Sequence, residues 1–372
     1  MKQILLLLLL FVNFSGYSQQ TLSKSIIHDN LERDYIIHIP STYSVNEPIP
    51  LVFCFHGYGG NANSIMSYTS FNYISDTASF IVVYPQGTLL QGTSHWNVGG
   101  WTLGSNIDDV GFINSLLDSL SQQYNIDDTR IYSAGMSNGG YMSFLLACQL
   151  SDRIAAIASV TGSMTIQTYN SCNPQHPTPI LQVHGTYDQI VPYLGNPSWT
   201  KSIDNVLQYW VDYNNCNASP THISLPNINP FDNSTVERLT WENGENTVAT
   251  DHLKVIGGGH DWFGVSGNMD INSSFEIWKF FSRYNINGLI GNISSTTETS
   301  INYNQLVKIV DVLGRQVNRQ PNTPLFYIYN NEFVEPQVSC TSILRNPKMS
   351  LLRSKKSESV ISDFKATFDS KF

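Results

Sequence analysis

Short, dense apolar segments that end at or beside a glycine are the feature that most constrains the fold of this chain. Four lie in its first half: IPLVFCFHG (49–57), SFIVVYPQG (79–87), TRIYSAGMS (129–137) and TPILQVHG (178–185). A fifth, DHLKVIGGG (251–259), follows later. Runs of this length and density are typical of strands buried on both faces of a sheet. RDYIIHIP (33–40) instead alternates polar and apolar residues and predicts a half-exposed strand.

Helical patterns separate these strands and cover residues 108–124, 138–150, 202–214 and 273–284. A chain that repeats strand, loop and helix predicts an α/β fold, with a mainly parallel sheet covered by helices on both faces. In open sheets of this kind, catalytic groups collect at the carboxyl ends of the strands. The residues that directly follow each apolar segment are therefore the candidates for a site.

Ser137 stands at such a strand end, in the sequence Gly135-Met-Ser-Asn-Gly139, directly before a helical pattern. A G-x-S-x-G between strand and helix is typical of a sharp turn that exposes a nucleophilic serine, because the glycines remove side chains that would clash there. The helix N-terminus adds a partial positive charge where an oxyanion would form. We therefore predict that Ser137 is a nucleophile.

A serine hydroxyl needs a base to take its proton and a carboxylate to orient that base. His260, in VIGGGHDWFG, follows a strand and precedes the last helix, which is the position that this chain order requires of the base. Asp188, in VHGTYDQIVPY, lies on the loop after the preceding strand and is the predicted acid. Asp261 is adjacent to His260, so its carboxylate is a poorer candidate for reaching the ring.

Other acidic and histidine side chains near the strand ends have structural interpretations. Asp108 and Asp109 precede the nucleophile, and we interpret them as a helix N-cap and a first-turn acid that interacts with the helix dipole. His56 and His184 each begin an HG pair at a strand end, and we interpret both as structural.

Acyl transfer also needs hydrogen-bond donors for a tetrahedral oxyanion. The glycine-rich turn HGYGG (56–60) predicts that the Tyr58 amide is one donor, and the Asn138 amide, directly after the nucleophile, is the expected second. Trp96 and Trp262 are candidates for lining the substrate pocket, with core packing as an equally good alternative. This chemistry requires no metal and no cofactor.

Seven motifs in order resemble one enzyme family: FHGYGG, YPQG, WNVGGW, DDVGFI, AGMSNGGYMS, HGTYDQIVPY and GGGHDWFG. The chain resembles the secreted polyhydroxybutyrate depolymerase and feruloyl esterase-like family, related to carbohydrate esterase family one, over roughly residues 23–285. The resemblance implies an α/β-hydrolase fold, with Ser137 as nucleophile, Asp188 as acid and His260 as base. It also implies a free Cys216, because this chain lacks the cysteine that many members place shortly before the catalytic histidine.

Composition limits the classes of molecule that this chain is expected to bind. Charged residues make up only 13% of the chain and its net charge is −9, which argues against a nucleic acid or an anionic membrane as partner. An ester substrate, small or polymeric, fits this balance better. The sequence does not indicate an oligomeric state.

The N-terminus and the cysteines indicate export. Residues 1–18 combine a positive Lys2, an apolar run and small residues before Gln19, as in a secretory signal peptide. The mature protein is then expected to be secreted, in an oxidising environment. We expect a disulfide between Cys148 and Cys172, which flank one strand-loop segment.

Beyond residue 285 the chain changes character. Residues 286–300 read as a linker rich in Asn, Ser and Thr, and residues 301–339 show short strands that resemble the C-terminal sorting domain of the type IX secretion system. Type IX machinery is thus an expected partner. Residues 340–372 carry seven Lys/Arg against three Asp/Glu, and we interpret them as an atypical basic tail without a fold of its own.

The predicted function is that of a secreted serine esterase that hydrolyses carboxylic esters through an acyl-enzyme. Feruloyl or acetyl esters on plant polysaccharide, hydroxyalkanoate polyesters and small generic esters are all open as substrates. The alternative is a catalytically inactive carbohydrate-binding protein that kept the same fold.

Overall fold

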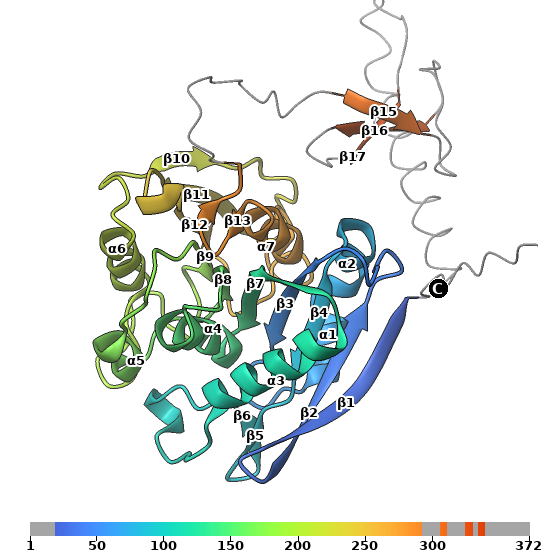
Figure 1. Cartoon of the computed structure of the whole chain (residues 1–372). Coiled ribbons are helices and arrows are strands. Elements are labelled where there is room, and N and C mark those ends of the chain that lie inside the picture. Colours follow the sequence, from blue (N-terminus) through green and yellow to red (C-terminus); the bar gives the residue numbers. More distant parts are fainter. Residues whose placement is uncertain (1–18, 292–305, 311–323, 330–333, 339–372) are drawn as a thin grey trace, which may run out of the picture. The chain divides into compact units, whose positions relative to one another are not determined.

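A computed structural model describes residues 19–291 and the backbone of residues 306–310, 324–329 and 334–338 (Figure 1). The chain divides into two compact units, Met1–Ile293 and Ser294–Phe372. The predicted signal peptide and basic tail, with most of the predicted linker, lie outside the described residues. Within the described residues, no helix is both long enough and apolar enough to cross a membrane.

A ten-stranded sheet forms the centre of the first unit, in the order β1-β2-β4-β3-β7-β8-β9-β12-β11-β10. All strands from β4 to β12 in this order are parallel, whereas β1, β2, β11 and β10 at the two ends pair antiparallel. The strands are β1 (Gln20–His28), β2 (Leu31–Ile39), β3 (Ile49–Phe55), β4 (Ile81–Pro85), β7 (Ile126–Met136), β8 (Ala156–Val160), β9 (Ile180–Gly185), β10 (Thr221–Ser224), β11 (Thr235–Trp241) and β12 (Thr250–Ile256).

Helices cover both faces of this sheet (Figure 1). Successive residues of β3 alternate between two cores: Phe53 packs with α3, α4 and α6, and Val52 packs with α1, α2 and α7. The helices are α1 (Ala62–Thr69), α2 (Phe71–Ala78), α3 (Asp109–Gln123), α4 (Asn138–Gln149), α5 (Ile166–Ser171), α6 (Ile203–Tyr213) and α7 (Ser273–Phe281). The predicted α/β class, with helices on both faces of a mainly parallel sheet, is confirmed.

Several short hairpins and 3₁₀ turns lie outside the main sheet and helices. They are the hairpin β5 (Thr88–Leu90) and β6 (Thr93–His95), the 3₁₀ turns Gly100–Thr102 and Glu245–Thr247, and the hairpin β13 (Tyr284–Asn285) and β14 (Gly288–Leu289). Because the Ile286 amide donates to Thr129 O at 2.8 Å, the first compact unit continues past residue 285.

The prediction of a half-exposed strand at residues 33–40 is wrong for most of β2. Every residue from Tyr35 to Ile39 is buried. The polar member of this stretch, His38, is bonded on both sides, to Thr21 Oγ1 at 2.8 Å and to Asp76 Oδ1 at 3.0 Å. The alternation therefore reflects a satisfied buried histidine rather than a solvent-facing edge.

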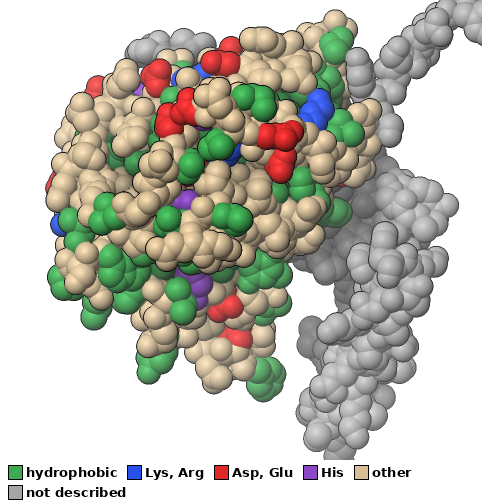
Figure 2. Space-filling view, turned by 90° about the horizontal axis from the view of Figure 1, so that it is seen from below, with side chains coloured by type: hydrophobic (Ala, Val, Ile, Leu, Met, Phe, Trp, Pro, Cys, Tyr) green, Lys and Arg blue, Asp and Glu red, His purple; other side chains and the backbone are tan. Residues whose placement is uncertain are grey.

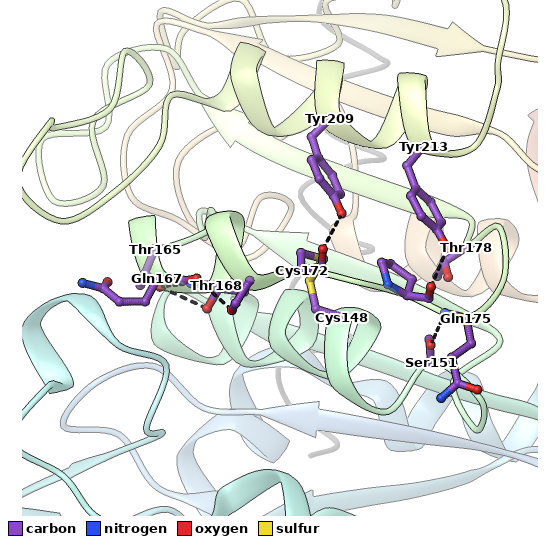
Figure 3. The surroundings of a disulfide bond; sticks show 12 residues. Cys148, Ser151, Thr165, Gln167, Thr168, Cys172, Gln175, Thr178, Tyr209 and Tyr213 are labelled. Atoms are coloured by element: carbon purple, nitrogen blue, oxygen red, sulfur yellow. Dashed lines mark hydrogen bonds between the residues drawn. A yellow bond between two sulfur atoms is a disulfide. The ribbon is translucent and has the colours of Figure 1, made fainter.

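The expected disulfide between Cys148 and Cys172 is confirmed. Figure 3 shows that it joins the C-terminal turn of α4 to the segment after α5. In that segment, Cys172 O accepts a hydrogen bond from Tyr209 Oη at 3.1 Å. The bond thus anchors the end of α4 that lies opposite to Ser137. Cys54 and Cys216 are free, as the family resemblance implied for Cys216, and Cys340 lies outside the described residues.

Removing this disulfide by the double change Cys148→Ala and Cys172→Ala is expected to lower the free energy of unfolding by about 3 kcal/mol. The reason is that the bond closes a loop over a separation of 24 residues and so restricts the unfolded chain. Urea unfolding of the two proteins measures the difference. Cys216→Ala, which removes a free thiol, is the control, and equal values for the double variant and this control would contradict the prediction.

The second unit contains β15 (Leu306–Val310), β16 (Pro324–Tyr329) and β17 (Val334–Val338). They form a three-stranded sheet in which β16 pairs antiparallel with both neighbours. All three strands fall within the predicted β-module of residues 301–339.

Candidate active site

Ser137 occupies the turn between β7, which ends at Met136, and α4, which begins at Asn138. Its backbone has φ +54° and ψ −120°, a conformation that side-chain-bearing residues rarely adopt and that costs about 1–3 kcal/mol. The Ser137 amide donates to Val160 O at 2.9 Å, which ties the strained turn to the end of β8. The surrounding fold therefore holds this serine in an unfavourable backbone conformation at a strand end.

The glycines on either side of Ser137 allow a very close approach of α4 to the sheet. A Cβ at Gly139 would lie 2.2 Å from Phe55 O, and a Cβ at Gly135 would lie 2.3 Å from the Gly139 carbonyl carbon. Real Cβ atoms do not come this near to backbone atoms, so any other residue would push the helix away from β3. The motif is therefore a packing requirement as well as a turn.

Asp188 and His260, predicted as acid and base, are hydrogen-bonded to each other. His260 Nδ1 lies 2.7 Å from Asp188 Oδ2, although 72 residues separate them in the chain. Because a carboxylate only accepts, the proton is on Nδ1, and Nε2 is left free to act as a base.

The other side of the Asp188 carboxylate is fixed by the backbone. Oδ1 accepts from the Ile190 and Val191 amides, each at 2.8 Å. Burial alone raises the pKa of Asp188, but the hydrogen bond and charge of His260, with the Val191 amide, lower it below its ordinary value overall. Asp188 is therefore an oriented anion at neutral pH.

His184 lies beside this carboxylate, and its contacts fit the structural role predicted for it. Its Nε2 lies 2.9 Å from Val191 O and 3.4 Å from Asp188 Oδ2. Burial lowers the pKa of His184 to about 4, so the ring is neutral and donates its single proton from Nε2.

Ser137 and His260 line one pocket of about 400 Å³. The other lining residues come from the turn after β3, from α1 and from the end of β7: His56, Gly57, Tyr58, Gly60, Ser64, Ile65, Tyr68 and Met136. Both Ser137 Oγ and His260 Nε2 are without a hydrogen-bond partner among the described residues, which leaves them open to a third group in the pocket. Figure 2 shows histidine side chains at the surface among hydrophobic ones on the face seen from below.

Of the two residues predicted to supply oxyanion donors, Tyr58 lines this pocket and Asn138 directly follows its serine. Tyr58 belongs to the pocket lining, and Asn138 is the first residue of α4, where helix amides have no partner within the helix. The Tyr58 and Asn138 amides donate to no acceptor among the described residues, so both are available to a ligand.

The turn that carries Tyr58 is held from two directions. The Gly59 amide donates to Ser94 O at 2.8 Å, and Ser94 Oγ donates to Gly60 O. His56 donates from Nδ1 to Gly57 O at 2.8 Å and accepts the Gly87 amide at Nε2 at 3.0 Å. These bonds fix the turn without using the Tyr58 amide.

The structure places Trp96 and Trp262 in the core and not in the pocket lining. Both are fully buried, and each indole N–H has a partner: Trp96 Nε1 donates to His56 O and Trp262 Nε1 to Ser274 Oγ, both at 2.9 Å. The Trp96 backbone also exchanges two hydrogen bonds with the Asn138 side chain, at 2.7 and 3.1 Å. The core-packing alternative fits these positions, with Trp96 bracing the residue next to the nucleophile.

One group of possible metal ligands comes together among the described residues: His28, Asp29 and Asp108. None of the three lines the pocket of Ser137. The side chains that meet in that pocket are suited to proton transfer and nucleophilic attack rather than to metal coordination.

A solved structure identifies the architecture. The acetyl xylan esterase from Aspergillus awamori aligns with a TM-score of 0.51 at 15% identity, over 72% of this chain and 99% of that one. The chain has an α/β-hydrolase fold.

Sequence comparisons support the family resemblance of this chain. Residues 33–173 match the family described as esterase PHB depolymerase, a stretch that includes Ser137 and ends before Asp188 and His260. The bifunctional acetylxylan esterase/xylanase of Neocallimastix patriciarum is 29% identical over 69% of this chain and 34% of its own length. Feruloyl esterase B of Piromyces equi is 28% identical over 61% and 42%, and probable feruloyl esterase C of Aspergillus flavus is 30% identical over 49% and 65%. The chain thus spans between about a third and two thirds of these relatives.

Asp109 has a larger role than that of the first-turn acid predicted from the sequence. Asp108 is the N-cap of α3, as predicted, and accepts the Gly111 amide at 2.8 Å. Asp109, however, is buried, pairs with Arg33 at 2.6 Å and accepts the Asn97 amide at 2.8 Å. It thereby ties β2 and α3 to the loop that carries Trp96. No local signal could reveal this pair, because Arg33 lies 76 residues away.

Lowering the pH from 7 to 5 is expected to destabilise the folded chain, because three histidines are buried in their neutral form. Burial lowers the pKa of His56 and His184 to about 4 and that of His252 to about 3. The unfolded chain binds these protons below about pH 6.5, whereas the folded chain does not until about pH 4, so acidification between these values favours unfolding. Each histidine lowers the stability by at most about 1.4 kcal/mol per pH unit, a limit approached as the pH falls well below about 6.5. Urea unfolding at pH 7, 6 and 5 measures the slope, and a flat dependence would contradict the assignment.

Proposed function

We propose that this chain is a serine esterase that hydrolyses carboxylic esters through an acyl-enzyme, with Ser137 as nucleophile, His260 as base and Asp188 as the orienting acid. The observation that carries the proposal is the Asp188–His260 hydrogen bond, which leaves Nε2 of a histidine that lines the same pocket as the strained Ser137 without a partner among the described residues. The esterases among the sequence relatives support it.

The proposed first step is attack of Ser137 Oγ on the ester carbonyl carbon while its proton passes to His260 Nε2. The imidazolium that forms is stabilised by the Asp188 carboxylate, which stays ionised. The carbonyl oxygen becomes an oxyanion and accepts the Tyr58 and Asn138 amides. When the intermediate collapses, the bond to the alcohol oxygen breaks and the alcohol takes the proton from His260.

The proposed second step repeats this chemistry with water. His260 Nε2 takes a proton from water, whose oxygen attacks the acyl carbon, and the oxyanion again accepts the two amides. Collapse breaks the bond to Ser137 Oγ, which recovers its proton from His260. The acid product leaves, and no group of the enzyme has changed.

The substrate class is an ester of a carboxylic acid, on plant polysaccharide, in a polyester or in a small molecule. A panel of p-nitrophenyl acetate, methyl ferulate, acetylated xylan and polyhydroxybutyrate tests the function and ranks the substrates. Turnover of at least one ester is expected. If none is hydrolysed while xylan is bound, the chain is a carbohydrate-binding protein on an esterase fold and the proposal fails.

We further propose that the chain is exported, with residues 1–18 as signal peptide, residues 19–285 as the esterase domain, 286–300 as a linker, 301–339 as a sorting module and 340–372 as a basic tail. The Cys148–Cys172 bond supports export, because disulfides persist in oxidising compartments. The three-stranded sheet of β15 to β17 supports a separate module. Recognition by type IX secretion machinery rests on the sequence resemblance alone.

A further inference from the structure

A chain of hydrogen bonds connects α1 to the loop that carries His260. Tyr68, on the last turn of α1, has its Oη 2.6 Å from Ser266 Oγ, and Ser266 Oγ lies 2.7 Å from Asp261 Oδ1. The Trp262 amide completes the chain at 3.4 Å from Tyr68 Oη. Tyr68 is separated from these partners by nearly 200 residues of sequence, 198 in the case of Ser266.

The direction of every proton in this chain follows from the Asp261 carboxylate. Because the carboxylate only accepts, Ser266 uses its single hydroxyl proton on Asp261. Ser266 Oγ must then accept from Tyr68, whose oxygen in turn accepts from the Trp262 amide. Aligned hydrogen bonds that end on a charge strengthen one another, so the chain acts as a unit.

The loop is folded tightly around this carboxylate. Gly267 has φ +67°, and a Cβ there would lie 2.5 Å from Asp261 Oδ2. The Asp261 carboxylate therefore lies against Gly267 and is bonded to Ser266, whereas the partner of His260 is Asp188. Its role is to anchor Ser266, and through it Tyr68.

Tyr68 also faces the pocket. Its side chain belongs to the same lining as Ser137 and His260. Tyr68 thus forms part of the pocket wall and also holds the segment that follows the proposed base. Its hydrogen bonds therefore link the pocket wall to the position of His260.

We propose that Tyr68 is a positioning residue that, through Ser266 and Asp261, fixes the loop of residues 257–272 and with it His260 relative to Ser137. This inference rests on the proposed function. Loss of the Tyr68 hydroxyl leaves the aromatic wall in place but releases the loop, so that His260 samples positions from which it cannot take the serine proton.

The kinetic test compares Tyr68→Phe with wild type on p-nitrophenyl acetate and p-nitrophenyl butyrate. We expect kcat to fall about tenfold for both esters, with KM changed less than twofold, because a hydrogen bond to a charged network is lost while the wall remains. Tyr73→Phe is the matched control, since that ring lies on α2 and is 76% exposed. An unchanged kcat for Tyr68→Phe would overturn the proposal.

Ser266→Ala breaks the same series of hydrogen bonds at its loop end. It provides a second test in case Tyr68→Phe does not fold. If the chain acts as a unit, the double variant loses no more activity than either single variant. Multiplied losses, about a hundredfold in kcat, would show two independent structural effects and would overturn the proposal.

Hydrogen exchange provides a readout that does not depend on catalysis. Amides in peptides covering residues 257–272 are expected to exchange at least tenfold faster in Tyr68→Phe than in wild type, with no change in the peptide covering β8. Equal exchange rates would reject the positioning role even if no ester in the panel were hydrolysed. Faster exchange in a chain that hydrolyses nothing would instead reject the proposed function and keep the positioning role.

Discussion

Ser137→Ala is expected to lower kcat for p-nitrophenyl acetate by about a millionfold, with KM nearly unchanged. The other members of a triad cannot compensate for a missing nucleophile, and only binding and the oxyanion donors remain. The change should leave folding intact, because Ser137 makes no side-chain hydrogen bond within the described residues and alanine has the same Cβ at this strained position. Initial rates with purified protein measure the effect.

The matched control is Ser171→Ala, which removes the hydroxyl of an exposed serine on α5. Labelling with a fluorophosphonate, followed by mass spectrometry of the peptide that contains residue 137, adds a direct test. We expect wild type and the control to be labelled there and Ser137→Ala to remain unlabelled. Equal hydrolysis rates for wild type and Ser137→Ala would refute the nucleophile assignment.

Asp188→Asn is expected to lower kcat by about ten-thousandfold. The backbone determines how the new amide would lie: the Ile190 and Val191 amides donate to Oδ1, so they select the amide oxygen at that position. The NH₂ group would then face His260 Nδ1 and force the ring to accept there. The imidazole proton would move to Nε2, and the base facing Ser137 would become a donor.

Steady-state kinetics of Asp188→Asn check this prediction. The control is Asp152→Asn, which removes an exposed carboxylate in a turn. The effect should appear in kcat and not in KM, because the amide has the same size as the carboxylate. A loss smaller than tenfold would mean that Asp188 does not set the tautomer of His260, and the acid assignment would have to be abandoned.

The sheet and the strand-end residues were predictable because they depend on local patterns. Dense apolar runs predicted β3, β4, β7, β9 and β12, and the rule that sites gather at strand ends selected Ser137, Asp188 and His260. The strand β8 was missed, since AIASV has small side chains and little apolar mass to signal it. Its alanines belong to the core on the face of α7, whereas Ile157 belongs to the core on the face of α4.

The residues that brace the site were not predictable, because they act across long separations in sequence. Tyr68 contacts Ser266 and Arg33 contacts Asp109, and neither contact produces a periodic pattern in the sequence. For Trp96 the sequence left a pocket wall and core packing equally open, and the buried ring and the backbone bond to Asn138 fit core packing.

The ends of the central sheet have a consequence for association between copies of this chain. One outer edge is the four-residue β10, fully exposed, and the other is β1, which presents polar residues and Lys24 along its length. Short or charged edge strands are poor templates for pairing with another sheet. The two edge strands of such a sheet could otherwise pair with the sheet of another molecule. Edges of this kind therefore disfavour aggregation through strand pairing.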